Sequence, residues 1–460
     1  MGNFTKNTMS RRSSLKLMGT GAVTLAGTSL FTRWGWSQSL PSSRTGNYVN
    51  IRTHEHYGDI EEQLMFPDTW ELEVIHMKGH GHHGLTSEQI RAKLNQPYGS
   101  PTLREIADGK KTAVVTFDDL TRPTPINEVL HFMVDDLRAA GLRDENILFL
   151  TSFGSHRPMS HTEARAKLGD FIVDNFVWLN HNPWENLTEV GVTSRGNKIM
   201  VNYLFSGADL RITVSGIKGH GDAGYGGGAK AVLPGVAWIN SIDYFHRTIS
   251  CRGTNPTIGL AKVFNNDIRL DMEEAARLAD VNFSVQIVYN EHRKPIDIFA
   301  GDIVEAHHNA CRKANGILRT PAVSNADVVV ANAYPQNRQA LSSLGWARAG
   351  LRDGGSAVLI AQHPDALTTM HYFNERREYK GQSYWEHLQD GKKGVHQASQ
   401  IIVFSQYMQK RDIDQITSKH VHLARSWNEV ITLLQKQHRT ELRVAVYPYA
   451  GIQHADVDLT

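Results

Sequence analysis

Short hydrophobic runs rich in β-branched residues alternate along this chain with segments whose apolar positions recur every three or four residues. Residues 113–117 form such a run, and residues 146–150 form the next. Between them, the apolar residues of the segment 126–137 follow helical spacing, and residues 162–176 also show a helical pattern. This alternation is typical of α/β proteins with parallel sheets.

The second half of the chain repeats the same alternation. Runs typical of buried strands, with helical segments between them, occur at residues 327–331, 356–361, 400–404 and 442–447. We therefore predict an α/β fold throughout, with helices that cover the sheets.

A stretch interrupted by Gly and Pro, at residues 316–321, predicts a boundary between two domains. We predict that residues 48–318, together with residues 442–460, form an N-terminal cofactor-binding domain, and that residues 320–440 form a smaller C-terminal α/β domain. Ligand sites commonly lie at domain interfaces, so we expect the active site in the cleft between these domains, which would close over the substrate.

Composition and charge narrow the class of protein. The chain has 460 residues, of which 40% are apolar and 21% charged, as in soluble globular proteins. Its formal net charge of +2 comes without a basic stripe, so we expect no nucleic-acid partner. The two cysteines, Cys251 and Cys311, match neither a zinc spacing nor a C-x-x-C motif. We interpret them as structural residues, with a disulfide left open if the compartment is oxidising.

The first 40 residues differ from the rest of the chain. Residues 10–16, Ser-Arg-Arg-Ser-Ser-Leu-Lys, precede a mildly apolar segment, and no acidic residue occurs before Glu55. This pattern predicts a twin-arginine export signal and a periplasmic protein with no membrane association beyond that signal. Residues 32–40 contain no clean A-x-A cleavage site, so an uncleaved anchor stays open. A disordered basic tail is the alternative interpretation.

The strongest chemical signal is the glycine-rich segment of residues 218–235, which has six glycines within residues 219–230. Glycines let a backbone approach a ligand closely, and a row of amides can cradle an anion. Lys230 closes this loop and could bond a phosphate or act as a nucleophile. A glycine-rich surface turn is the alternative.

Two familiar phosphate motifs fit this loop poorly. Residues 229–231, Ala-Lys-Ala, lack the Ser or Thr of a Walker loop. Residues 224–229 follow the Gly-x-Gly-x-x-Ala spacing of a dinucleotide fingerprint, and Asp243 lies near the position of its acidic residue. However, the preceding residues are polar, and Pro-Gly at residues 234–235 interrupts the helix that should follow. A nicotinamide-dependent dehydrogenase is therefore kept as the enzymatic alternative.

The loop and two other segments together resemble the nickel-pincer lactate racemase family. His220 precedes a Gly-Gly-Gly-Ala-Lys sequence that ends at Lys230, and His246 follows this lysine after Pro-Gly. Residues 118–125, Asp-Asp-Leu-Thr-Arg-Pro-Thr-Pro, look like the family's Asp-x-Thr-Arg-Pro segment, and residues 154–159 look like its His-Arg-Pro segment. The three motifs occur in the family's order and approximate spacing, and the resemblance covers most of the chain from about residue 60 to the end.

The resemblance implies a particular cofactor. Lys230 would carry, through a covalent link, a pyridinium-dithiocarboxylate mononucleotide that grips nickel as a pincer, and His246 would be the protein's ligand to the metal. Planar sites with sulfur and imidazole donors suit Ni(II). The residues expected to hold the cofactor's phosphate are Thr121, Gly226, Gly227 and Gly228, helped by Arg122. Proteins that build the cofactor would be partners.

The resemblance also implies a reaction, racemisation or epimerisation at C2 of a 2-hydroxy acid. One histidine of the pair His156 and His220 would take the hydroxyl proton while the C2 hydrogen leaves as hydride to the cofactor. The hydride would then return to the other face of the planar keto acid. Each histidine must serve as acid and as base, which needs a pKa near neutrality. We expect Arg122 to touch the substrate or cofactor, with Asp119 orienting it.

One segment departs from the family pattern and leaves the substrate open. In the family, a glutamine and a lysine follow a Tyr-Pro, whereas here the residues after Tyr-Pro, 336–346, include no lysine. The corresponding positions are Ser342 and Gly345, and Arg338 is a candidate replacement for carboxylate binding. Lactate, a sugar acid, an aromatic hydroxy acid and malate all stay open. The non-enzymatic alternative is an exported metal- or ligand-binding protein that has lost catalysis.

A second group of histidines lies outside these motifs. His76, His80, His82 and His83 occur in a Gly-flanked segment without acidic or cysteine partners nearby in the sequence. We expect a solvated loop, or residues that border the cleft, with a separate metal site as the alternative.

Overall fold

The computed structural model describes residues 46–250, 255–365, 394–414, 416, 418 and 420–460. Gly46–Thr460 forms one compact unit. The predicted export signal at residues 1–40 and Cys251 lie outside the described residues. No helix among those that are described is long and apolar enough to cross a membrane.

The first large sheet has the strand order β14-β13-β9-β4-β5-β6. Its strands are β4 (Ala113–Phe117), β5 (Ile147–Thr151), β6 (Val177–Asn180), β9 (Leu210–Gly216), β13 (Phe283–Tyr289) and β14 (Pro295–Gly301). All neighbours pair in parallel except β13 and β14, which are antiparallel. β4 and β13 are buried along their whole length, as expected for strands with both faces covered.

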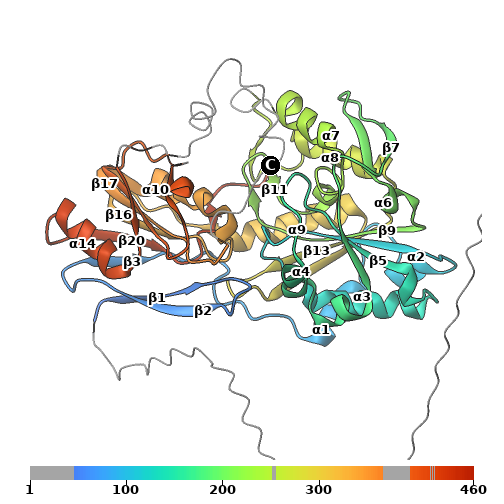
Figure 1. The fold of residues 1–460 in the computed structure, drawn as a ribbon, viewed down its shortest axis with the longest axis horizontal. Helices are drawn as coiled ribbons and strands as arrows, with labels where there is room; N and C mark the ends of the chain where they lie inside the picture. The colour runs from blue at the N-terminus through green and yellow to red at the C-terminus, as the bar shows by residue number, and fades with distance from the viewer. Residues whose placement is uncertain (1–45, 251–254, 366–393, 415, 417, 419) are drawn as a thin grey trace, which may run out of the picture. The chain divides into compact units, whose positions relative to one another are not determined.

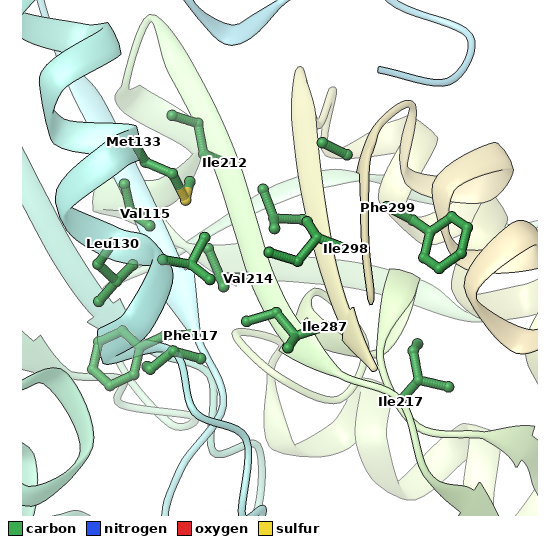
Figure 2. Packing of buried hydrophobic residues seen from close by; sticks show 14 of the residues in the cluster. Val115, Phe117, Leu130, Met133, Ile212, Val214, Ile217, Ile287, Ile298 and Phe299 are labelled. Carbon is green, nitrogen blue, oxygen red and sulfur yellow. The ribbon is translucent and has the colours of Figure 1, made fainter. Parts of the chain in front are cut away.

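Helices cover this sheet on both faces. They are α1 (Ser87–Leu94), α2 (Leu103–Ala107), α3 (Asn127–Ala139), α4 (His161–Leu168), α5 (Asp170–Asn175), α6 (Tyr203–Gly207), α7 (Ile239–Tyr244), α8 (Asp267–Leu278) and α9 (Ile303–Leu318). α9 packs on β13 and β14 (Figure 1). Figure 2 shows Leu130 and Met133 of α3 directed at Val115 of β4 and Ile212 of β9, in the largest buried cluster.

The second large sheet has the order β19-β18-β17-β16-β20-β3, with every neighbouring pair parallel. Its strands are β3 (Glu71–Val74), β16 (Ala326–Asn332), β17 (Leu351–Ile360), β18 (Gln400–Phe404), β19 (Val421–Ala424) and β20 (Arg443–Tyr447). The accompanying helices are α10 (Gly345–Gly350), α13 (Lys410–Ile413) and α14 (Trp427–Gln437). Separate hydrophobic clusters occupy the two faces of this sheet.

Short pairings complete the structure. They are β1 (Tyr48–Thr53) with β2 (Ile60–Met65), β7 (Leu187–Val192) with β8 (Lys198–Asn202), β10 (Gly219–His220) with β11 (Ala223–Tyr225) and β12 (Gly259–Leu260), and β15 (Arg319–Thr320) with β21 (His454–Ala455). Single turns of 3-10 helix lie at Asp144–Asn146 and Gly228–Ala231, a longer one at Asn337–Leu344, and a π-helical turn at Phe245–Ile249.

The predicted α/β class is confirmed, and two details differ from the prediction. The helix expected at 162–176 is two helices, α4 and α5, because Gly169 between them has a φ of 81°. The strand expected at 442–447 forms, but it pairs with β16 and β3 in the second sheet. Its assignment to the N-terminal domain is therefore wrong for β20, and so is the assignment of β3, which pairs with β20 at the edge of the same sheet. The remaining domain boundaries stay a prediction.

Candidate functional site

The carboxyl ends of β4 and β5 bring together the first pair of predicted site residues. Asp119 follows the last residue of β4 by two positions, and His156 lies in the loop after β5. Neighbouring parallel strands end at the same edge of a sheet, where ligands of α/β proteins commonly bind. The Nδ1 atom of His156 lies 2.8 Å from Oδ2 of Asp119. The carboxylate thereby holds the proton on Nδ1 and leaves Nε2 as the basic atom of the ring.

Thr121 and Arg122 extend this pair into a network. The Thr121 hydroxyl donates to Asp119 at 2.5 Å, and Nη1 of Arg122 donates to that hydroxyl oxygen at 2.9 Å. Burial alone raises the pKa of Asp119. The charge and hydrogen bond of His156, the charge of Arg122 and the Thr121 hydroxyl outweigh burial and hold this pKa well below its ordinary value. Asp119 is therefore ionised throughout the neutral range.

The structure connects Asp119 to Arg122 through the Thr121 hydroxyl, and the orienting role of Asp119 stays a prediction. Asp119 contacts His156 directly, and Arg122 reaches the same network through the Thr121 hydroxyl and carbonyl. The buried ammonium of Lys167 stabilises the loop of residues 118–122. It donates to the Arg122 carbonyl at 2.8 Å and pairs with Asp118 at 2.6 Å. The loop is thus fixed independently of any ligand.

His220, the second predicted acid/base residue, ends the short strand β10. Its Nδ1 atom accepts hydrogen bonds from the backbone amides of Asp222 at 3.2 Å and Ala223 at 3.1 Å. In the neutral ring the proton therefore lies on Nε2. Burial lowers the pKa of His220 well below its ordinary value, and the charges of Lys230 and Arg122 lower it further.

His156 and His220 consequently present opposite hydrogen-bonding capacities when both are neutral. His156 has its proton on Nδ1 and a basic Nε2, whereas His220 accepts at Nδ1 and donates from Nε2. The positive charge of Arg122 lowers the pKa of Asp119 and the pKa of His220, so Arg122 lies near both residues. A base and a hydrogen-bond donor near one cation suit a proton transfer at an oxygen atom.

Lys230 lies in the 3-10 turn Gly228–Ala231, two positions after the last of three consecutive glycines. Two of their amides are used within the protein, since Gly226 donates to the Lys218 carbonyl and Gly228 to Oε1 of Gln286, both at 2.8 Å. The amides of Gly226 and Gly228 are therefore already bonded within the protein, and the expected role of Gly227 in holding a phosphate stays a prediction. The glycines instead allow close packing: a Cβ on Gly228 would lie 2.6 Å from the His307 ring.

His246, the predicted metal ligand, lies in the π-helical turn Phe245–Ile249. Its Nδ1 atom lies 2.7 Å from the carbonyl oxygen of Ile242, which fixes the proton on Nδ1 and leaves the lone pair on Nε2. This turn and the turn that carries Lys230 both pack against α8. The fold thus brings His246 and Lys230 to the same helix.

Sequence reasoning missed several residues of the site. A small cavity is lined by Asp119, Leu120, Thr121, His156, Arg157, Met159, Glu163 and Arg338. Arg157 makes a two-pronged ion pair with Glu163, and this pair lowers the pKa of Glu163 to about 2 against the effect of burial. Arg157 was part of the His-Arg-Pro segment, but Glu163 carried no signal beyond its place at the start of a helix.

Two further residues connect the second sheet to this site. Gln336 follows the Tyr-Pro at the end of β16, and its Nε2 donates to the Thr121 carbonyl at 2.9 Å. Lys218 donates to the side-chain oxygen of Gln336. Arg338, the candidate for carboxylate binding, does line the cavity, but it pairs with Asp365 and lies 3.6 Å from Glu163. Its charge is therefore shared with two carboxylates.

The dinucleotide fingerprint lacks its structural context. Residues 224–229 begin in β11 and continue into the 3-10 turn, so no long helix starts at the glycines. Asp243 lies on α7 and pairs with Arg247 at 2.7 Å. A nucleotide-binding strand–loop–helix unit is therefore not formed here, which weakens the dehydrogenase alternative.

The fold and the histidine–carboxylate network define an α/β protein with a site suited to acid–base chemistry. A family model described as the lactate racemase N-terminal domain matches residues 57–258. A lactate racemase of Lactiplantibacillus plantarum is 31% identical over 289 residues, which cover 61% of this chain and 67% of that protein. This chain belongs to the lactate racemase family.

Other comparisons agree. A lactate racemase of Thermoanaerobacterium thermosaccharolyticum is 29% identical over 318 residues, covering 67% of this chain and 74% of that protein. The structure of the lactate racemase apoprotein from the same organism is similar with a TM-score of 0.64 at 22% identity, over 88% of this chain and 100% of that one. A protein of Thermotoga maritima has a TM-score of 0.59 at 18% identity, over 81% and 98% of the two chains.

Proposed function

We propose that this protein racemises or epimerises a 2-hydroxy acid at C2 by transient hydride transfer, with His156 and His220 as its acid/base residues. Family membership supports a racemase in general. The observation that carries the finer proposal is the pair of histidines with opposite hydrogen-bonding capacities, together with Arg122, whose charge acts on His220 and on Asp119, the partner of His156.

The residues present fit the family's nickel-pincer nucleotide. Lys230 stands in a tight turn beside α8, and the Ile242 carbonyl prepares Nε2 of His246 as a metal ligand. Lys230 would hold the nucleotide covalently and His246 would bind the nickel. When bound, this group supplies the acceptor and donor of the C2 hydride. Thr121 is a weaker candidate for phosphate binding, because its hydroxyl is already engaged by Asp119 and Arg122.

The chain's own residues move the hydroxyl proton. The basic Nε2 of His156 accepts it, and the fully ionised Asp119 stabilises the imidazolium that results. The Nε2–H of neutral His220 donates to the substrate oxygen on the other side. In the reverse direction the His156 imidazolium returns the proton to that oxygen. For the opposite enantiomer His220 would be the base, which requires its ring proton to move from Nε2 to Nδ1 and the amides of Asp222 and Ala223 to release Nδ1. Arg122 stabilises the negative charge that develops on the oxygen.

The substrate is proposed only as a class, a 2-hydroxy acid. The two relatives are named lactate racemases, but Ser342 and Gly345 occupy the positions after the Tyr-Pro where this family carries a glutamine and a lysine. Ser342 is exposed, and its hydroxyl donates to the Gln339 carbonyl at 2.8 Å. The cations that line the cavity are instead Arg157 and Arg338. We propose that this change in the position of the cation alters which 2-hydroxy acid the site selects.

The decisive experiment measures intact mass and nickel content of protein from a host that makes the cofactor, with a peptide map over residues 218–235. The proposal expects an adduct on Lys230, about one nickel per chain, and loss of optical purity in one of a panel of 2-hydroxy acids. Lys230→Ala should lose the adduct and all racemisation. Racemisation by that variant would contradict the proposal.

Two alternatives give different results in the same experiment. A nicotinamide-dependent dehydrogenase predicts a dissociable cofactor, an unmodified Lys230 and net oxidation of the substrate. A binding protein without catalysis predicts reversible nickel uptake, or none, and no turnover in a host with the biosynthetic proteins.

We also propose that the protein is exported to the periplasm through the arginine pair at residues 11–12. Export of a folded protein fits a cofactor that is attached before transport. Replacement of both arginines by lysine should leave the protein in the cytoplasm on cell fractionation. Unchanged export of that variant would refute a twin-arginine route.

A further inference from the structure

Three side chains with metal-binding atoms meet behind the lysine loop, outside the site described above. Glu273 comes from α8, and His307 and His308 come from α9. One potential ligand atom from each lies within 4.8 Å of the other two. Figure 1 shows α8 and α9 as neighbouring helices, and the two helices are in contact. The motifs of the sequence did not include any of these three residues.

The ring of His307 is oriented by a backbone contact, as the rings of metal-binding histidines usually are. This ring is 1% exposed, and its Nε2 lies 2.9 Å from the Gly226 carbonyl oxygen. The carbonyl holds the proton on Nε2 and leaves the lone pair on Nδ1. Metal-binding histidines usually donate their other N–H to a carboxylate or a backbone carbonyl in this way. Burial lowers the pKa of His307 well below its ordinary value, so the ring is neutral as a ligand must be.

His308 and Glu273 complete the group. Nε2 of His308 lies 3.0 Å from Oε1 of Glu273, and their side chains are 22% and 13% exposed. The Phe264 ring packs edge-on against His308 with ring centroids 5.1 Å apart, which restricts the imidazole. The group is thus held in place, yet solvent can reach it. A cation would replace the contact between imidazole and carboxylate.

Two neighbouring side chains, Arg269 and Cys311, affect how well these three residues could bind a cation. The buried guanidinium of Arg269 disfavours a cation, but it donates to the carbonyls of Ala223, Tyr225 and Gly227, and the carboxylate of Glu273 offsets it. Sγ of Cys311 lies 3.7 Å from Nδ1 of His307, which adds a soft atom beside the group. Nitrogen and oxygen ligands with a nearby thiol favour a first-row transition cation over Mg²⁺ or Ca²⁺.

We propose that Glu273, His307 and His308 form a second metal site, for a divalent transition cation such as Zn²⁺, with solvent in the fourth position. The site is separate from the proposed nickel ligand His246. Because His307 bonds to Gly226 and packs on Gly228, a cation there would fix the glycine turn that presents Lys230. The proposed role is therefore structural.

Zn²⁺ binding to the purified full chain tests this site by equilibrium dialysis with metal analysis. Every protein compared should carry His80→Ala, His82→Ala and His83→Ala, which removes the exposed histidine loop as a competing binder. We expect about one Zn²⁺ per chain in this background. Glu273→Gln and His308→Asn keep hydrogen-bonding capacity but remove a metal ligand. Each should raise the Kd for Zn²⁺ by more than about 100-fold, which exceeds the effect of losing a residue that only hydrogen-bonds to a ligand.

The matched control is Glu274→Gln, one position along α8, whose carboxylate bonds to Ser194 instead. This control should bind Zn²⁺ as its parent does. No Zn²⁺ binding by the parent, or equal binding by the parent and the Glu273→Gln variant, would overturn the proposal.

A second measurement guards against misfolded variants. Zn²⁺ should raise the Tm of the parent and slow amide exchange in residues 223–231, and it should do neither in Glu273→Gln, whose Tm without metal should match the parent. If Zn²⁺ protects Glu273→Gln equally, the bound metal lies elsewhere and the proposal fails.

Discussion

Asp119 determines which nitrogen of His156 carries the ring proton. Its carboxylate lies against Nδ1 of the ring at 2.8 Å and is kept ionised by the surrounding donors. Asp119→Asn removes this preference, because an amide can also donate to Nδ1 and move the ring proton to Nε2.

We expect Asp119→Asn to lower kcat for racemisation by about 10²–10⁴-fold, the range for loss of positioned acid–base catalysis, with a near-wild-type circular dichroism spectrum. The control is Asp136→Asn, whose carboxylate pairs with Arg91 on the surface of α3. A racemisation rate for Asp119→Asn within twofold of wild type would show that Asp119 does not set the tautomer.

Glu55 is a buried carboxyl that the proposed reaction does not use. It accepts hydrogen bonds from the Asn337 backbone amide at 3.0 Å. Burial raises the pKa of Glu55 to about 7 from 4.5, although the Asn337 amide and the charges of Arg338 and Arg293 oppose the rise. The folded state therefore retains a proton that the unfolded chain releases between these two pKa values.

The free energy of unfolding should consequently fall as pH rises from about 4.5 to 7, by about 3 kcal/mol from this group. Glu55→Gln cannot titrate, so the stability difference between wild type and variant should shift in favour of the variant across this window. Urea unfolding at pH 5 and pH 8 measures the shift. Parallel pH curves for the two proteins would contradict the raised pKa.

At the scale of elements, the glycine turn before Lys230 is determined by its packing partners. Gly228 has a φ of 61°, and a Cβ there would lie 2.6 Å from the His307 ring. Both the backbone conformation and the space favour glycine. The sequence showed the concentration of glycines, whereas the reason for it, a fully buried histidine from α9, became visible only in the structure.

We expect Gly228→Ala to lower the free energy of unfolding by about 1–3 kcal/mol through backbone strain and overpacking, and to slow racemisation. Gly221→Ala in the same loop is the control, because open space surrounds its Cβ position. That change should cost less than about 0.5 kcal/mol. Equal stabilities of the two variants in urea would show that Gly228 tolerates a side chain.

The periodic elements were predictable because their local signals agree with their packing. Residues 113–117 and 326–332 lie in strands within sheets covered on both faces, and continuous apolar runs are typical of such strands. α3 was evident from apolar residues at helical spacing. The break at Gly169 was missed because a single glycine inside a helical pattern is a weak signal.

At the scale of the whole molecule, Gln336 joins the second sheet to the Asp119 loop. Its amide donates to the Thr121 carbonyl, and its oxygen accepts from Lys218. Gln336 lies 215 positions from Thr121 and 118 positions from Lys218 along the chain. Nothing in their local sequence indicates that they meet, so only the tertiary structure could identify the contact.

A double-mutant cycle of Gln336→Ala with Lys218→Met should give a coupling energy of about 0.5–3 kcal/mol in urea unfolding. The comparison pair, Lys218→Met with Ser342→Ala, should be additive within about 0.5 kcal/mol, because Ser342 bonds only within its own turn among the contacts described. Additivity in both cycles would mean that Gln336 does not couple the two sheets.

The sequence by itself determined the α/β class, most of the strands and the motif residues His156, His220, Lys230 and His246. Hydrophobic periodicity and spaced motifs are properties of neighbouring residues, which a sequence displays directly. The tertiary structure decided what those residues touch: Asp119 orients His156, and His307 packs against the glycine turn. It also decided that β20 joins the second sheet. Such contacts join distant segments, and they depend on chain topology and burial rather than on any local pattern.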